Sequence, residues 1–132
     1  MNPDPIIQAG LKSAPLVALI GNRYALAQLP ANTAYPAIVY TIVDTVPEPN
    51  VNPFAGARLH RARVQFNPLA LSMGAVKELH TALITAMDYI HNETVGGKLV
   101  MSCRVGMAGP ASKDNDAGVY TQPLDFILRY YA

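Results

Sequence analysis

The sequence predicts an α+β domain over residues 1–132, with an antiparallel-rich β-sheet packed on one side by a long helix and short N-terminal helices. Residues 58–66 alternate between apolar and polar side chains, which is typical of a strand with one buried face. Residues 37–46 are mostly β-branched or aromatic, and apolar side chains from Val76 to Ile90 recur at helical spacing. A chain of 132 residues has room for one hydrophobic core.

The N-terminal segment reads as two short helices. Asp4 is a candidate N-cap, and Pro5 would then occupy the first helical position, where its missing N–H costs nothing. Ser13 can cap the second helix, and Gly21 can end it in a left-handed conformation. We expect these helices to cover a sheet.

The middle of the chain predicts three strands. A short strand around residues 24–26 is followed by a loop between Pro30 and Pro36, and then by the strand at 37–46. Both faces of that strand are largely apolar, which favours a central position or a covered second face. In the strand at 58–66, the alternation directs Ala62, Val64 and Phe66 to the core and Arg61, Arg63 and Gln65 outward.

The C-terminal half predicts one long helix and two strands. Ser72 is a plausible N-cap for the helix, which residues 91–97 would end. The strands fall at 98–107 and 120–131, where Pro123 implies a bulge or an edge position because proline cannot donate to the ladder.

The composition suits assembly better than catalysis. Hydrophobic residues make up 51% and charged residues only 14%, so we expect a partner to cover part of the surface. The formal net charge is only +1, so the chain lacks the strong positive electrostatic potential that attracts nucleic acid. There is no P-loop, GxSxG or HExxH motif, and we expect no enzymatic activity, no cofactor and no metal.

The location of the protein is also constrained. Cys103 is the one cysteine, so no disulfide can form within the chain, as is usual in a reducing cytosol. Residues 1–4 lack the positive charge that opens a signal peptide, and the apolar run at 14–20 is too short to span a bilayer. We therefore expect an intracellular protein that does not enter a membrane.

Two loops and one strand supply the candidate assembly residues. Phe54 would lie at the tip of the proline-rich loop 47–57, where it either anchors a partner or packs onto its own core. The outward arginines of the strand either contact phosphate or a partner's carboxylates, or form an ordinary solvated face. The loop 109–118 reads as a hairpin tip rather than a calcium loop, because no glutamate completes the calcium pattern. The candidates are Asn50, Phe54, Arg61, Arg63, Lys113, Asp114 and Asp116.

Several short motifs occur in a recognisable order along nearly the whole chain. They are Gly21-Asn22-Arg23-Tyr24, Leu29-Pro30, Pro36-Ala37-Ile38-Val39-Tyr40 and Leu124-Asp125-Phe126. In this order and spacing the sequence resembles the small tail-completion, or tail terminator, proteins of long-tailed bacteriophages and prophages. The motifs Asn67-Pro68 and Pro123 depart from that pattern.

The resemblance implies a virion structural protein that forms a ring, typically a hexamer. Such a ring caps the tail tube, stops tube polymerisation and offers a surface to head–tail connector proteins. The implied location is the virion tail, with host cytoplasm during assembly, and no catalytic residues carry over. Two other classes stay open: another head–tail adaptor of the neck, and a small-molecule binder or enzyme of unknown type.

Overall fold

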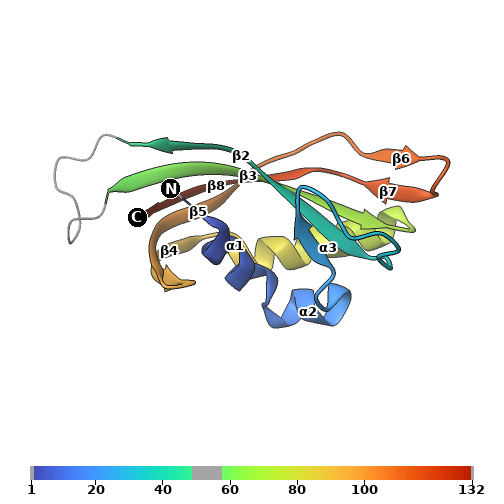
Figure 1. Ribbon diagram of the computed structural model, residues 1–132, viewed down its shortest axis with the longest axis horizontal. Helices are drawn as coiled ribbons and strands as arrows, with labels where there is room; N and C mark the ends of the chain where they lie inside the picture. The colour runs from blue at the N-terminus through green and yellow to red at the C-terminus, as the bar shows by residue number, and fades with distance from the viewer. Residues whose placement is uncertain (1, 49–57, 132) are drawn as a thin grey trace.

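A computed structural model describes residues 2–48 and 58–131 of the chain (Figure 1). Within these residues, three helices and eight strands follow one another. In chain order they are α1 (Asp4–Leu11), α2 (Ala14–Ile20), β1 (Tyr24–Leu26), β2 (Ala37–Pro47), β3 (Leu59–Ala70), α3 (Met73–Met87), β4 (Ile90–Val95), β5 (Lys98–Ala108), β6 (Ser112–Asp114), β7 (Val119–Thr121) and β8 (Leu124–Tyr131).

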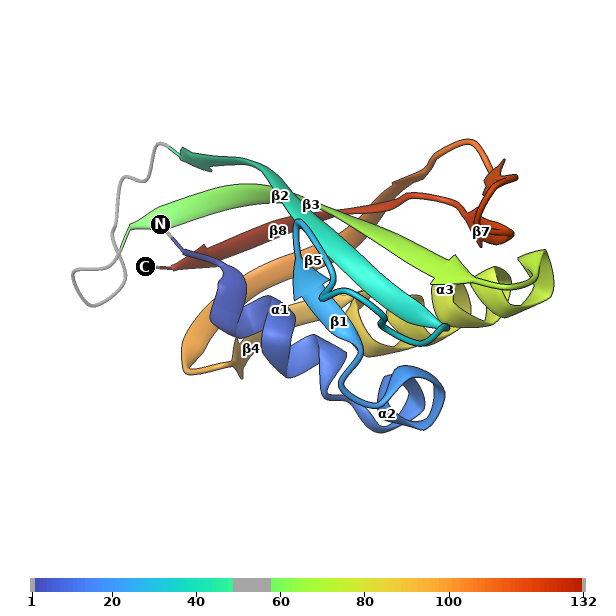
Figure 2. The same cartoon turned by 45° about the vertical axis from the view of Figure 1, so that its right-hand side comes forward.

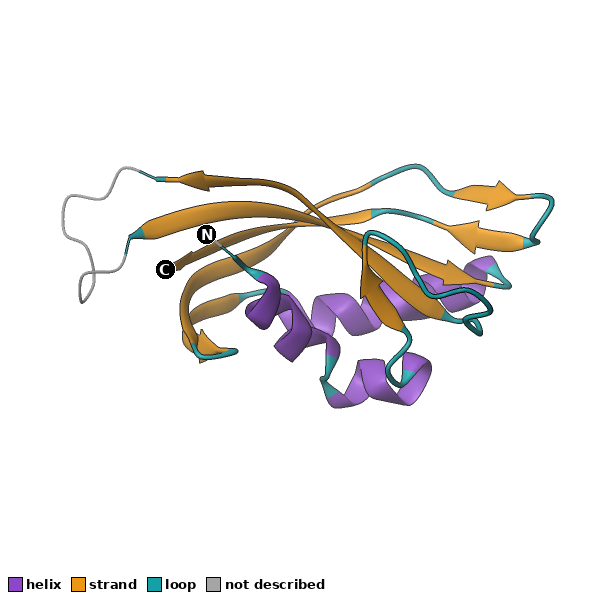
Figure 3. Cartoon of the chain, viewed as in Figure 1, coloured by secondary structure: helices purple, strands orange, loops and turns teal. Residues whose placement is uncertain are grey.

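The strands form one sheet in the order β1-β2-β3-β8-β5-β4. Every pairing is antiparallel except that of β1 with β2. The short strand β7 pairs with the end of β3 and carries β6 as a hairpin that projects from the body (Figure 2). All three helices lie on one side of the sheet (Figure 3), which confirms the expected α+β class and layering.

The core lies between the sheet and the helices. The inward side chains of β3 and β8 are buried, including Ala62, Val64, Phe66 and Phe126. The Phe66 ring packs edge-on against Phe126 at 5.6 Å and lies 6.1 Å from Tyr40 of β2, measured between ring centroids. The alternation in residues 58–66 therefore predicted the buried face correctly.

The first helix is held to the sheet by a polar contact. The Tyr40 hydroxyl donates a hydrogen bond to the Asp4 carboxylate and accepts one from Gln8 Nε2 at 2.8 Å. Burial, and then the bond to Asp4, raise the pKa of the Tyr40 hydroxyl, which therefore stays protonated as a donor. Asp4 is the first residue of α1 rather than its cap, which is Pro3.

Two of the other expected helix ends agree with the structure. Gly21 ends α2 at φ +58°, a backbone conformation that suits glycine. Ser72 caps α3, and its side-chain oxygen accepts a hydrogen bond from the Ala75 N–H at 3.2 Å. Ser13 precedes α2 but its side chain forms no capping bond.

The long helix is shorter than the sequence indicated. It ends at Met87, and the residues expected to close it instead form the edge strand β4. The chain reverses through Tyr89, whose φ is +61°, and Ile90 then pairs with Cys103 of β5. Ile90 continued the apolar stripe of the helix, so periodicity alone could not mark this boundary.

Two proline positions also differ from expectation. Strand β3 continues through Asn67 and Pro68 to Ala70, beyond the expected end at Phe66. Pro123 lies between β7 and β8 and divides the expected last strand, and its carbonyl accepts a hydrogen bond from the Gly109 N–H at 2.8 Å. Pro123 is therefore accommodated outside the ladder, whereas Pro68 lies within β3 opposite Ile38 of β2.

Strand β2 is central only over its first half. There it lies between β1 and β3, whereas from Asp44 onward β3 is its one neighbour among the described strands. Its second face is not covered by these elements, since the Val43 and Val46 side chains are 47% and 41% exposed. Both faces of this strand are apolar, as the sequence predicted, but one of them faces outward instead of being covered.

We predict that Phe66→Ala lowers the free energy of unfolding by about 3–5 kcal/mol, because it removes a fully buried ring between two others. Urea denaturation followed by circular dichroism measures the change. Met107→Ala is the control, since that side chain is 58% exposed and should change the value by less than about 1 kcal/mol. Equal losses in the two variants would contradict the assigned core.

Candidate assembly surfaces

The side of the sheet opposite the helices, here called the open face, is made by the side chains that alternate with the buried ones. Rows of register cross β2, β3, β8 and β5, so that each row places four outward side chains next to one another. One row runs from Val46 through Arg61 and Arg129 to Ser102. The next runs from Asp44 through Arg63 and Ile127 to Arg104.

Four arginines therefore share the open face. They come from three strands: Arg61, Arg63, Arg104 and Arg129. The alternation along β3 predicted the two on that strand, whereas Arg104 on β5 and Arg129 on β8 were not predicted. The signal was present, because each of those alternates with a buried residue of its strand, as Arg129 does with Leu128 and Tyr130.

Arg63 is held by its own chain. Its Nη2 and Nε atoms donate to the Asp125 Oδ2 atom at 2.5 and 3.1 Å. Asp125 is only 4% exposed, and among the described residues its second oxygen has no partner. The hydrogen bond and charge of Asp125 raise the pKa of Arg63. This arginine therefore neutralises a buried carboxylate, which limits its availability to a partner.

The other three arginines have looser contacts. Arg129 Nε lies 3.3 Å from Glu48, and the Arg104 guanidinium lies 5.7 Å from the centre of the Tyr89 ring. Arg61 is exposed and forms no ion pair with the described residues. The open face thus presents positive groups that a partner can reach.

The β6–β7 hairpin confirms that residues 109–118 include a hairpin tip. Lys113, Asp114 and Asp116 are all exposed on it. The Asp114 carboxylate accepts hydrogen bonds from the N–H groups of Asp116 and Ala117, which shapes the turn. The Lys113 ammonium lies 5.2 Å from the Tyr120 ring centre. The expected candidates Asn50 and Phe54 lie outside the described residues.

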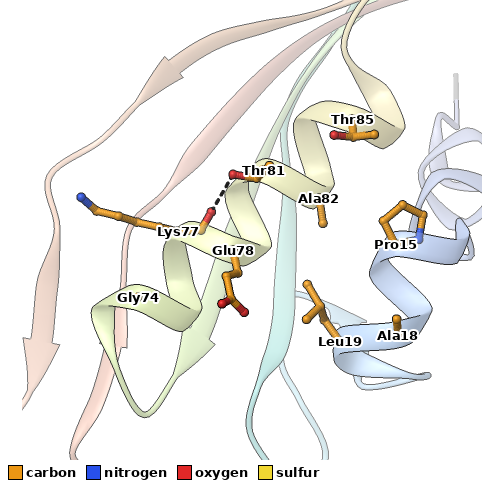
Figure 4. Close-up of a pocket in the computed structure, with 9 residues that line it drawn as sticks. All are labelled: Pro15, Ala18, Leu19, Gly74, Lys77, Glu78, Thr81, Ala82 and Thr85. Atoms are coloured by element: carbon orange, nitrogen blue, oxygen red, sulfur yellow. Dashed lines mark hydrogen bonds between the residues drawn. The ribbon is translucent and has the colours of Figure 1, made fainter.

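A groove of about 590 Å³ lies between α2 and α3 (Figure 4). Leu19 points into it from α2, while Lys77 extends away from Glu78 on α3, and Thr81 donates to the Lys77 carbonyl at 3.1 Å. No pair of acid–base groups converges there. The groove is an apolar surface between helices.

The cysteine and two of the histidines are engaged within the fold. Cys103 is fully buried, and burial raises the pKa of its thiol to about 12. A nitrogen of His60 lies 2.9 Å from the Arg58 carbonyl, and one of His80 lies 2.7 Å from the Gln122 carbonyl. In the part of the chain that the structure describes, no three His, Cys, Asp or Glu side chains group as metal ligands.

Within residues 2–48 and 58–131, no helix is both long and apolar enough to cross a bilayer.

Comparison with solved structures gives a clear likeness of fold. A chain of the virion of a native gene transfer agent particle matches with a TM-score of 0.72 at 15% sequence identity, over 96% of this chain and 92% of that one. The present chain is similar in fold to a virion component. A second structure, whose chain carries no functional name, matches with a TM-score of 0.59 at 16% identity over 100% and 96% of the two chains. Neither a protein-family model nor a curated protein matches the sequence.

We predict that Arg63→Met lowers the urea midpoint of unfolding, because it leaves the buried Asp125 carboxylate without its charge partner. Adding Asp125→Asn to the same chain should recover part of the loss, since an amide is less costly to bury than an unpaired charge. Arg61→Met is the matched control and should stay close to the unmodified protein. If the two single arginine variants unfold at the same midpoint, the Arg63–Asp125 pair has no structural role.

We also predict that Cys103 does not react with a thiol reagent in the folded protein at about pH 8, because the reactive thiolate is suppressed by burial. Absorbance after addition of a disulfide reagent measures the reaction. One thiol per chain should react once urea unfolds the protein. Rapid reaction of the native protein would show that β5 is open to solvent at this position.

Proposed function

We propose that this chain is a structural protein of a phage-like virion and, more specifically, a tail terminator. In this proposal several copies form a closed ring, with six as the expected number. The ring caps the tail tube, stops the addition of tube subunits and offers its other surface to head–tail connector proteins. The role is structural rather than enzymatic.

The observation that carries the proposal is the likeness in fold to a chain of a gene transfer agent virion. The likeness extends over 96% of this chain and 92% of the other, so it concerns the whole fold rather than one shared motif. The order of short motifs along the sequence independently resembles tail terminators. The likeness in fold and the order of motifs agree on a virion component, and the order of motifs favours a protein at the end of the tail tube.

The surfaces of the molecule support an assembly role. The open face exposes apolar side chains beside its arginines, including Val46 and Met107, which are 41% and 58% exposed. Aromatic, methionine and arginine side chains are enriched where proteins meet. On the opposite side, α2 and α3 present an apolar groove. A ring subunit needs contacts to two neighbours and to the structures above and below it.

The direct test adds the purified protein to tail-tube subunits of the same phage or prophage while they polymerise. We predict that tubes stop growing in the presence of the protein, because a ring at the growing end occupies the site for the next subunit. Electron micrographs give the distribution of tube lengths. The heat-unfolded protein serves as the control.

Tubes that grow to the same unregulated lengths with and without the folded protein would rule out the terminator role. In that case, binding to isolated portal complexes distinguishes a neck adaptor. An adaptor should bind portal complexes and leave tube lengths unchanged, whereas a terminator should bind tube ends.

A further inference from the structure

A hollow of about 460 Å³ lies on the open face, where β8, β5 and β4 adjoin. Its walls combine basic, aromatic and thioether side chains with one hydroxyl. They are Tyr89, Ile90, His91, Met101, Ser102, Arg104 and Arg129. The register confirms this placement, since Ser102 lies between His91 and Arg129 in neighbouring strands.

The polar groups of this hollow suit a carboxylate. Two guanidinium groups border it, and arginine recognises carboxylates through paired hydrogen bonds. Arg104 forms no ion pair with a carboxylate of the described residues, and Arg129 meets Glu48 through its Nε atom at 3.3 Å. The nearby Asp88 carboxylate is engaged by the Val105 N–H at 2.9 Å. Arg104 therefore has no carboxylate partner among the described residues and can pair with one from another protein.

An exposed aromatic ring borders the same hollow. The Tyr89 side chain is 75% exposed, and the backbone of Tyr89 has φ +61°, a conformation that residues other than glycine rarely adopt. Arg104 lies over this ring, and tyrosine and arginine dominate the energetics of many protein interfaces. An aromatic side chain presented in this way fits a contact with another protein.

The chain carries a matching acidic element on the β6–β7 hairpin. Its tip includes Asp114 and Asp116, both exposed, and the Asp116 carboxylate forms no bond with the described residues. The one lysine of the hairpin, Lys113, has its ammonium 5.2 Å from the Tyr120 ring centre, so the two carboxylates outnumber it. The hairpin projects from the end of the molecule opposite β4 and the β4–β5 turn (Figures 1 and 2).

The tip cannot reach the hollow of its own chain. Arg104 is aligned with Arg63 of β3 through Ile127, whereas the hairpin joins β3 at Ala70. Seven residues of strand separate these positions, or about 23 Å at roughly 3.3 Å per residue, and the hairpin tip extends farther in the same direction. Any contact between the two must join different copies.

We propose that the acidic tip of the β6–β7 hairpin of one copy enters the arginine hollow of the next copy. The contact uses two different surfaces, so it is heterologous, and repeated around an axis it closes a ring. This inference rests on the proposed ring and specifies how neighbouring subunits recognise each other. Charge complementarity also fixes the direction of assembly, because tip against tip and hollow against hollow both bring like charges together.

A charge exchange tests this contact. Asp116→Lys alone and Arg104→Glu alone should each weaken self-association by about tenfold or more, because each places like charges in contact. The two substitutions in one chain restore opposite charges with the signs exchanged, so association should recover to near the unmodified level. Lys12→Glu is the control for a charge reversal on an exposed lysine away from both surfaces, and it should have no effect. Sedimentation velocity over a range of concentrations, free and with tube subunits, measures association, and circular dichroism checks folding.

Disulfide cross-linking between two copies tests whether the hairpin tip lies in the hollow. Asn115→Cys in one chain and Ser102→Cys in a second, differently tagged chain should form a mixed disulfide under mild oxidation, because the tip enters the hollow. Pairing Asn115→Cys with Lys12→Cys should not give that product.

The two proposals fail in different ways. Single charge reversals that assemble like the unmodified protein, or an exchanged pair that does not recover, would overturn the contact even if tubes are capped. A chain that stays monomeric both free and with tube subunits would also overturn it. Recovery by the exchanged pair, with tubes of unregulated length, would support the contact and reject the terminator role.

Discussion

The helices of this protein pack against one face of the sheet, and the rest of the structure depends on that arrangement. Phe66, Phe126 and the side chains around them are buried because α1 and α3 cover them. The same strands carry alternating side chains on the other face, where no element of the described chain lies. A sheet with one open face has a buried core on one side and a broad surface for contacts on the other.

The polar interactions follow from this division. On the covered side, the Tyr40 hydroxyl joins Asp4 and Gln8, and so fixes the first helix over the sheet. On the open face, Arg63 neutralises Asp125, while other arginines remain reachable. A monomer with this surface would expose valine and methionine side chains beside several arginines, and methionine and arginine are enriched at interfaces. The proposed ring would give that surface a function.

Much of the architecture could be predicted because buried apolar side chains recur along the sequence at the spacing of a strand or a helix. Alternation identified the inward residues of β3, and Ser72 marked the start of α3. The polar edge strand β4 was not predicted, since its residues follow no apolar alternation and its position depends on pairing with β5. The arginine hollow was missed for a similar reason: it joins residues of three strands, and the sequence does not reveal which strands are neighbours. Arg61 and Arg63 were found because they lie two residues apart.

In the proposed function this protein acts at the end of a tail tube. Gold particles attached to the protein, located on completed tail tubes by electron microscopy, test this position. We expect gold at a single end of each tube, in a cluster consistent with one ring. Gold distributed along the tube walls, or absent from tubes altogether, would contradict it.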